Sequence, residues 1–137
     1  MSDLLDEDAP DAEDFVICAM ASVMACSGEK FSGDEWPFCI VQRVAGADLP
    51  DEGIDYPVVQ LDFYAPGIQA AKAAANEGHR RMMYLARNLV DINMSDGSIA
   101  NADYVKTFQK AVKLPYADDL IRRYSARYEL GLSYVAV

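Results

Sequence analysis

The fold of this chain is decided by residues 56–88, which read YPVVQLDFYAPGIQAAKAAANEGHRRMMYLARN. Over residues 58–65 the side chains alternate between two faces, which is the period of a half-buried strand. From Ile68 onward the apolar residues recur at helical spacing. One stripe contains Ile68, Ala71, Ala75, Gly78, Met82, Leu85 and Leu89. The stretch therefore predicts a strand that passes through Ala65-Pro66-Gly67 into one long helix. Because the first half of the stripe is small, we expect this helix to lie close on a sheet.

The flanking segments supply the remaining elements. Residues 11–27 predict a first helix, with Asp11, Glu13 and Asp14 near its positive end. Residues 36–44 and 120–135 alternate as strands. Residues 104–114 fit a helix or a strand, and we favour a strand because the long C-terminal strand needs a partner. The predicted fold is α+β in the order α-β-β-α-β-β, a four-stranded, mainly antiparallel sheet with both helices packed on one face.

Two segments are predicted to lack regular structure. Residues 1–12 are acidic and poor in large apolar residues, so we expect a mobile N-terminal tail before a single domain over residues 13–137. Residues 45–55, AGADLPDEGID, contain four acids, two glycines and one proline. This composition predicts a loop that is too long for a tight hairpin. The second helix is expected to end near Asp91, before the turn-forming residues 93–103.

Charge is divided unevenly along the chain. Residues 1–65 carry a balance of −13 and residues 66–137 a balance of +3, within a net charge of −10. This balance argues against a dedicated nucleic-acid binder, which normally has a basic excess. A split of this kind indicates surfaces of opposite sign that could meet in neighbouring copies. The alternative interpretation is an ordinary acidic protein with an acidic tail.

No motif for catalysis, cofactor binding or metal binding is recognisable. His79 is the single histidine and is expected to be a solvated helix position without a converging partner. Cys18 and Cys26 are predicted on one helix, about 12 Å apart along its axis, which is too far for a shared metal. We expect free, buried thiols in a reducing cytosol. The apolar residues 15–26 are short of the roughly 20 needed to span a membrane.

Contact surfaces are better supported than a reactive site. The acids of residues 48–55 form one candidate surface, and arginines of the second helix and of the long C-terminal strand form others. The candidate interaction residues are Asp48, Asp51, Glu52, Asp55, Arg80, Arg81, Arg87, Arg123 and Arg127. Lys106, Lys110 and Lys113 give the preceding strand a basic side as well. Together these groups favour head-to-tail self-assembly, which closes into a ring when the rotation allows it.

Four segments also resemble a known family. They are PFCIVQRVAG (residues 37–46), the stretch YPVVQLDFYAPG (56–67), the alanine-rich helix after it, and RRYSARYEL (122–130). This pattern resembles the tail terminator, or tail completion, proteins of long-tailed bacteriophages, over residues 13–135. The resemblance implies a structural virion protein at the junction of tail and neck, assembled in the host cytoplasm. It would form a hexameric ring that caps the tail tube and stops its polymerisation.

The resemblance also implies partners. These are other copies of the chain, the tail tube protein, and a head-completion or stopper protein of the neck. DNA would pass through the lumen without sequence-specific contact, and no membrane or cofactor is involved. Two alternatives stay open: another head-to-tail connector component, and a small cytosolic α+β enzyme or ligand-binding module. The second needs a pocket with convergent polar groups, for which only His79 and Asp118-Asp119 are candidates.

Overall fold

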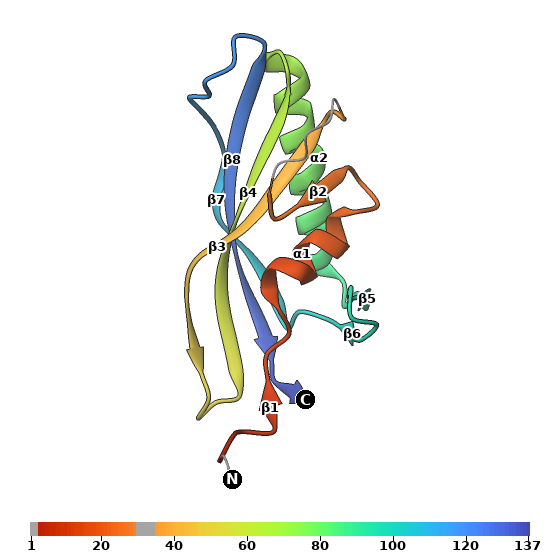
Figure 1. Ribbon diagram of the computed structural model, residues 1–137, viewed down its shortest axis with the longest axis vertical. Coiled ribbons are helices and arrows are strands. Elements are labelled where there is room, and N and C mark those ends of the chain that lie inside the picture. Colours follow the sequence, from red (N-terminus) through yellow and green to blue (C-terminus); the bar gives the residue numbers. More distant parts are fainter. Residues whose placement is uncertain (1–2, 30–34) are drawn as a thin grey trace.

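The computed structural model describes residues 3–29 and 35–137 and is shown in Figure 1. Two helices and nine strands, several of them very short, make up the described chain. In chain order they are β1 (Glu7–Asp8), α1 (Ala12–Met20), β2 (Ala25–Ser27), β3 (Phe38–Leu49), β4 (Ile54–Pro66), α2 (Ile68–Arg87), β5 (Ile92–Asn93), β6 (Ile99–Ala100), β7 (Tyr104–Leu114), β8 (Ile121–Ser133) and β9 (Val135–Ala136).

The main sheet has five strands in the order β2-β3-β4-β8-β7. Strands β3, β4, β8 and β7 pair with one another in the antiparallel direction, as predicted, and β8 lies between β4 and β7. The prediction of four strands was wrong by one, because β2 pairs with β3 in the parallel direction. Residues 104–114 are a strand, which confirms the preferred interpretation of that segment.

The first helix is shorter than predicted, and this explains the extra strand. It ends at Met20, where the backbone N–H groups of Val23 and Met24 both donate to the carbonyl of Met20. The chain then turns and lays Cys26 beside Cys39 of β3. Cys18 and Cys26 therefore do not share a helix. A continuous apolar run fits a buried helix and a buried strand equally well, so spacing alone could not place this break.

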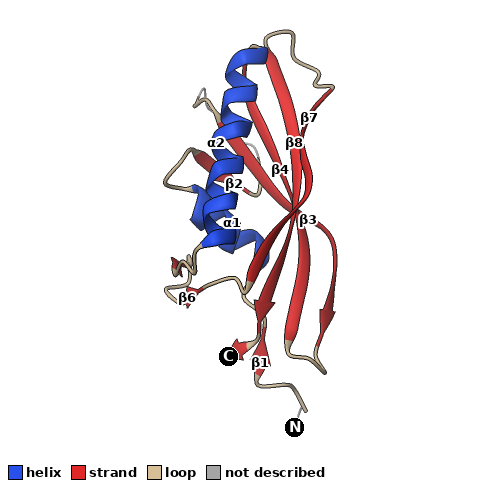
Figure 2. Cartoon of the chain, turned by 180° about the vertical axis from the view of Figure 1, so that it is seen from behind, coloured by secondary structure: helices blue, strands red, loops and turns tan. Residues whose placement is uncertain are grey.

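Both helices lie on one face of the sheet, as Figure 2 shows and as the sequence predicted. Long helix α2 packs against β4, β7 and β8, and α1 packs mainly against β3. The inner residues of the predicted stripe, Ala71, Ala75, Gly78, Met82 and Leu85, are all buried. Ile68 and Leu89 are exposed because they lie at or beyond the ends of the helix. The core lies between this helix layer and Val59, Leu61, Phe63, Tyr128 and Leu130 of the sheet.

Residues 45–55 are not a loop, contrary to the prediction. β3 and β4 stay paired as far as Leu49 and Ile54, and the connection is a tight turn in which Gly53 donates to the carbonyl of Leu49. Gly46, with φ +107°, occupies a position where a Cβ would lie 2.7 Å from Cα of Pro57. Only glycine fits there without strain. The hairpin consequently projects well beyond the helix layer (Figure 1).

The two ends of the described chain lie together. Glu7 and Asp8 of β1 pair with Ala136 and Val135 of β9, and Val137 N–H donates to the carbonyl of Asp6. The pairing of β1 with β9 involves part of residues 1–12, the segment that we expected to be a mobile tail. Residues 1 and 2 of that segment lie outside the described chain. The mobility of the tail stays a prediction.

Candidate interaction surfaces

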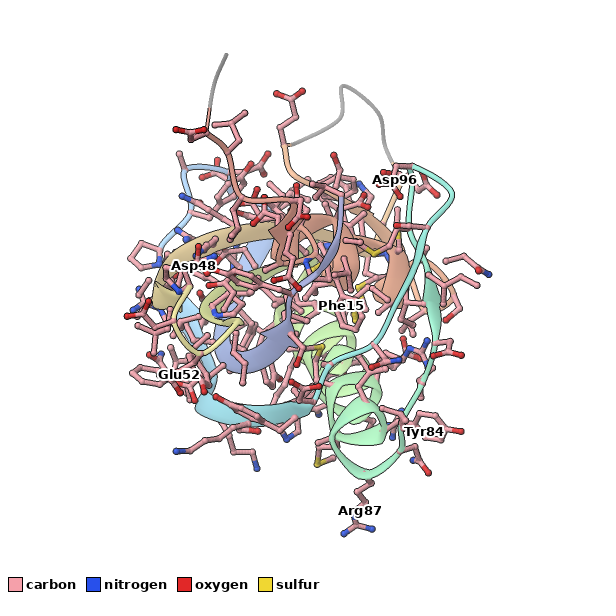
Figure 3. All side chains as sticks on the ribbon, turned by 90° about the horizontal axis from the view of Figure 1, so that it is seen from below. Phe15, Asp48, Glu52, Tyr84, Arg87 and Asp96 are labelled. Atoms are coloured by element: carbon pink, nitrogen blue, oxygen red, sulfur yellow. The ribbon has the colours of Figure 1, made fainter. Side chains whose placement is uncertain are left out.

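The turn of the β3–β4 hairpin presents three exposed acids, Asp48, Asp51 and Glu52, which we call the acidic hairpin end. Asp48 accepts a hydrogen bond from the hydroxyl of Tyr134 at 2.6 Å, and this bond raises the pKa of Tyr134 to about 12. Asp55, the fourth predicted acid, is only 4% exposed. Figure 3 shows Asp48 and Glu52 on one side of the molecule, away from Arg87.

Asp55 faces inward because Arg43 holds it. The two terminal nitrogens of Arg43 lie 2.7 and 2.8 Å from the two carboxylate oxygens of Asp55. This fork geometry is the strongest arrangement for an arginine and a carboxylate. The hydrogen bond to Asp55 raises the pKa of Arg43. Asp55 therefore stabilises the hairpin and presents no free charge to a partner.

The N-terminal segment adds further acids beside the hairpin. A groove is lined by Asp8, Asp11, Glu13, Arg43, Asp48 and Asp55. Glu13 is fixed there because its carboxylate accepts the backbone N–H of Arg43 at 2.7 Å. The sequence did not predict that these carboxylates lie together, although the charge balance of −13 over residues 1–65 indicated an acidic region. The acidic half of the chain thus gathers N-terminal and hairpin carboxylates in one region.

Helix α2 offers two free arginines rather than three. Arg80 and Arg87 are exposed, as predicted. Arg81 is half-buried, and its Nε donates to the carbonyl of Ala19 at 2.8 Å. Its guanidinium carbon also lies 5.9 Å from the ring centre of Tyr84. Arg81 therefore joins α2 to the last turn of α1, where a cation suits the negative end of the helix.

The arginines of β8 lie on the sheet face opposite the helices. Arg123 Nε donates to Asp62 at 3.0 Å, and Arg127 Nε donates to Gln60 at 3.0 Å. Gln60 in turn donates to the second oxygen of Asp62 at 2.9 Å. Asp62 is 4% exposed under these longer side chains. Arg123 and Arg127 thus cover a polar face of the sheet, and Arg123 forms an ion pair with the carboxylate of Asp62. Both arginine side chains stay partly exposed to solvent.

His79 is not a solvated position, contrary to the prediction. Its Nδ1 lies 2.7 Å from the hydroxyl of Tyr128, a fully buried residue of β8. Burial, and secondly the charge of Lys110, lowers the pKa of His79. The pair therefore joins α2 to the sheet through a hydrogen bond.

The cysteines occupy packing positions. Cys39 is fully buried, and burial raises the pKa of its thiol well above the usual value. Cys18 and Cys26 are half-buried, and all three are free thiols. Within residues 3–29 and 35–137 no group of three or more His, Cys, Asp or Glu side chains is arranged to hold a metal ion. In the same part of the chain, no helix combines the length and the apolar character that crossing a bilayer requires.

The fold and its surfaces define a two-layer α+β domain with a mixed five-stranded sheet and one uncovered sheet face. No protein-family model matches the chain, and no curated protein matches its sequence. Its structure is similar to that of a chain from the "Virion of native gene transfer agent (GTA) particle". The TM-score is 0.54 at 14% identity, and the match covers 89% of this chain and 87% of the other. At this identity the likeness establishes a shared fold over nearly the whole domain.

Proposed function

We propose that this protein is a structural component of a virion, and specifically a tail terminator. In this role it forms a hexameric ring that caps the tail tube, ends its polymerisation and joins the tail to the head-neck connector. The observation that carries the proposal is the fold shared with a chain of a virion particle over 89% of this protein. The sequence resemblance to tail terminators supports the same role independently of that comparison.

A protein of this kind works by contact rather than by chemistry. A ring needs two different surfaces on each copy, because every subunit meets one neighbour on each side. The acidic hairpin end supplies one of them, and the exposed cations of α2 and of the sheet are candidates for the other. The ends of the ring then meet the tail tube protein on one side and a head-completion or stopper protein on the other. The net charge of −10 would keep DNA in the lumen from adhering.

The experiment that tests this role is a measurement of assembly state with and without tail-tube ends. The purified protein is examined by light scattering over a concentration series and by negative-stain imaging with tubes. Rings of six, or single rings on tube ends, are the expected result. A protein that stays monomeric and ignores tube ends at every concentration refutes the proposal. A protein that binds portal–adaptor complexes but not tubes is instead another connector component.

A further inference from the structure

We propose that strand β7 is the surface that receives the acidic hairpin end of a second copy of this chain. This inference rests on the proposed ring and names the two faces that form its subunit interface. The donor is the hairpin end, with Asp48, Asp51 and Glu52, and the acceptor is β7, with Lys106, Lys110 and Lys113.

Strand β7 is an unpartnered edge of the sheet. It pairs with β8 on one side and has no neighbour on the other among the described residues. Phe108 is 60% exposed and Val112 is 43% exposed, so the edge presents apolar as well as charged side chains. The pairing with β8 shifts register on both sides of Gln109. Such bulges disfavour the addition of a further regular strand, so we infer that β7 is contacted through its side chains.

Within residues 3–29 and 35–137, no ion pair involves the lysines of β7. The strand contains no acid, and the ion pairs of the described chain are Arg43–Asp55 and Arg123–Asp62. Glu129, the acid opposite Lys106, accepts the hydroxyl of Tyr104 at 2.8 Å. Three exposed lysines on one edge strand, of which Lys106 and Lys113 extend from opposite faces of the sheet, are therefore available to a partner outside this copy.

The acidic hairpin end matches this surface in charge and in chemistry. Its exposed charges are the three carboxylates, and half-buried Leu49 and Ile54 lie beside them on either strand of the turn. Its geometry is fixed, because Glu52 and Gly53 both donate backbone hydrogen bonds to the carbonyl of Leu49. The hairpin projects beyond the helix layer, which leaves its end free to reach another molecule (Figure 1).

One copy cannot bring its hairpin end to the Lys113 end of its own β7. Ile54 at the hairpin end lies opposite Ser133 of β8, whereas Lys113 lies opposite Tyr124 of the same strand. These two positions on β8 are nine residues apart, which is about 30 Å at the rise of an extended strand. The Lys113 end of the acceptor is thus distant from the donor in one subunit, whereas Lys106 lies opposite Glu129, four positions from Ser133. A contact that brings the hairpin end to Lys113 is heterologous. Contacts of this type close into rings or continue as filaments.

The other basic surfaces fit the hairpin end less well. Helix α2 has three exposed cations, Lys72, Arg80 and Arg87, because Arg81 is bonded to α1, but exposed Glu77 lies among them on the same helix. Arg123 and Arg127 of β8 are already bonded to Asp62 and Gln60. Of these three basic elements, β7 alone combines exposed cations and exposed apolar side chains with a sequence that contains no acid.

The test is an exchange of charge between the two surfaces in the full chain. One variant carries Asp51→Lys and Glu52→Lys, and the other carries Lys110→Glu and Lys113→Glu. Each alone is expected to lose self-association by more than about tenfold, because like charges then face each other. Mixed in equal amounts they should assemble again, because each hairpin end now matches the β7 of the other variant. Such a ring alternates strictly and contains equal numbers of both variants.

A matched control reverses two of the three exposed cations of the helix with Arg80→Glu and Arg87→Glu. It is expected to assemble like the natural chain, and unfolding midpoints verify that all three variants remain folded. The inference is overturned if both surface variants still form rings, or if the mixture stays dissociated. In either case, rings formed by the natural chain would still support the tail-terminator role. Rings that respond as expected but do not cap tubes refute that role and keep the interface. A natural chain that stays monomeric even with tube ends overturns both.

Discussion

The substitution Gly78→Ala is predicted to destabilise the protein, although alanine is the better helix former. Gly78 lies in the middle of α2, where the helix passes over Phe63 of β4 and Met20 of α1. A Cβ at this position would stand closer than 3.0 Å to two ring carbons of Phe63 and 3.1 Å from Cε of Met20. Both neighbours are fully buried, so neither can swing into solvent.

Two opposing effects decide the size of the change. Replacing glycine by alanine inside a helix stabilises it by about 1 kcal/mol. Adding a methyl group to a close-packed contact costs about 1–3 kcal/mol. Because the contact at Phe63 is shorter than real Cβ atoms tolerate, we place the packing cost at the upper end of this range. The expected net loss in the free energy of unfolding is about 2 kcal/mol.

Urea denaturation followed by circular dichroism measures this change through the midpoint at constant slope. The matched control is Ala73→Gly on the exposed side of the same helix, which should lose about 1 kcal/mol by propensity alone. A second variant, Gly78→Ala with Phe63→Leu, should recover part of the loss because it removes the ring. If Gly78→Ala stabilises the protein by about 1 kcal/mol, the close approach of α2 to the sheet is refuted.

Three further predictions concern the hairpin and the single histidine. Arg43→Met should cost about 3 kcal/mol in urea denaturation, because it leaves the carboxylate of Asp55 buried without its partner; adding Asp55→Asn should recover part of that loss, and no recovery would argue against the pair. Gly46→Ala should lower the thermal midpoint, because φ +107° and the nearby backbone of β4 exclude a Cβ. An unchanged midpoint would contradict that geometry. His79 has a lowered pKa in the folded state, through burial and then Lys110, so the unfolded chain binds the proton more tightly. Stability should therefore fall as pH drops below about 6.5, and His79→Gln should reduce this slope in denaturation curves between about pH 7 and 5.

The elements with a clear period were predictable from the sequence. The change from alternation to helical spacing at Pro66-Gly67 located the junction of β4 and α2 correctly. The alternation of residues 120–135 located β8 to within two residues at each end. In both places local pattern and final packing agree, because each strand buries one face against the helix layer.

The errors arose where composition and tertiary pairing disagree. Residues 45–55 have the acids, glycines and proline of a loop, yet they pair as strands on either side of a tight turn. A register shift between Arg43 and Ala45 also separates them from the regular alternation of residues 36–44. The strand order also requires contacts between segments far apart in the chain, such as β4 with β8, which no local pattern reports.

The candidate site residues show the same limit. The sequence shows which side chains are charged but not which partners they bond within the fold. Arg123 bonds a carboxylate 61 positions away, and Arg81 bonds a carbonyl 62 positions away. These long-range bonds leave some predicted residues as structural members and others, such as Asp51 and Arg87, as exposed surface. Only a folded backbone separates the two groups.

The distance between the free charges explains how an uneven charge distribution can favour assembly. If the acidic and basic surfaces were neighbours, they would neutralise each other within one molecule. Here Lys113 lies about 30 Å along the sheet from the hairpin end, whereas salt screens exposed charges beyond about 8 Å at physiological ionic strength. Attraction between Lys113 and the hairpin end inside one copy is therefore negligible. It becomes effective only when two copies bring them into contact, so folding itself leaves this attraction available for assembly.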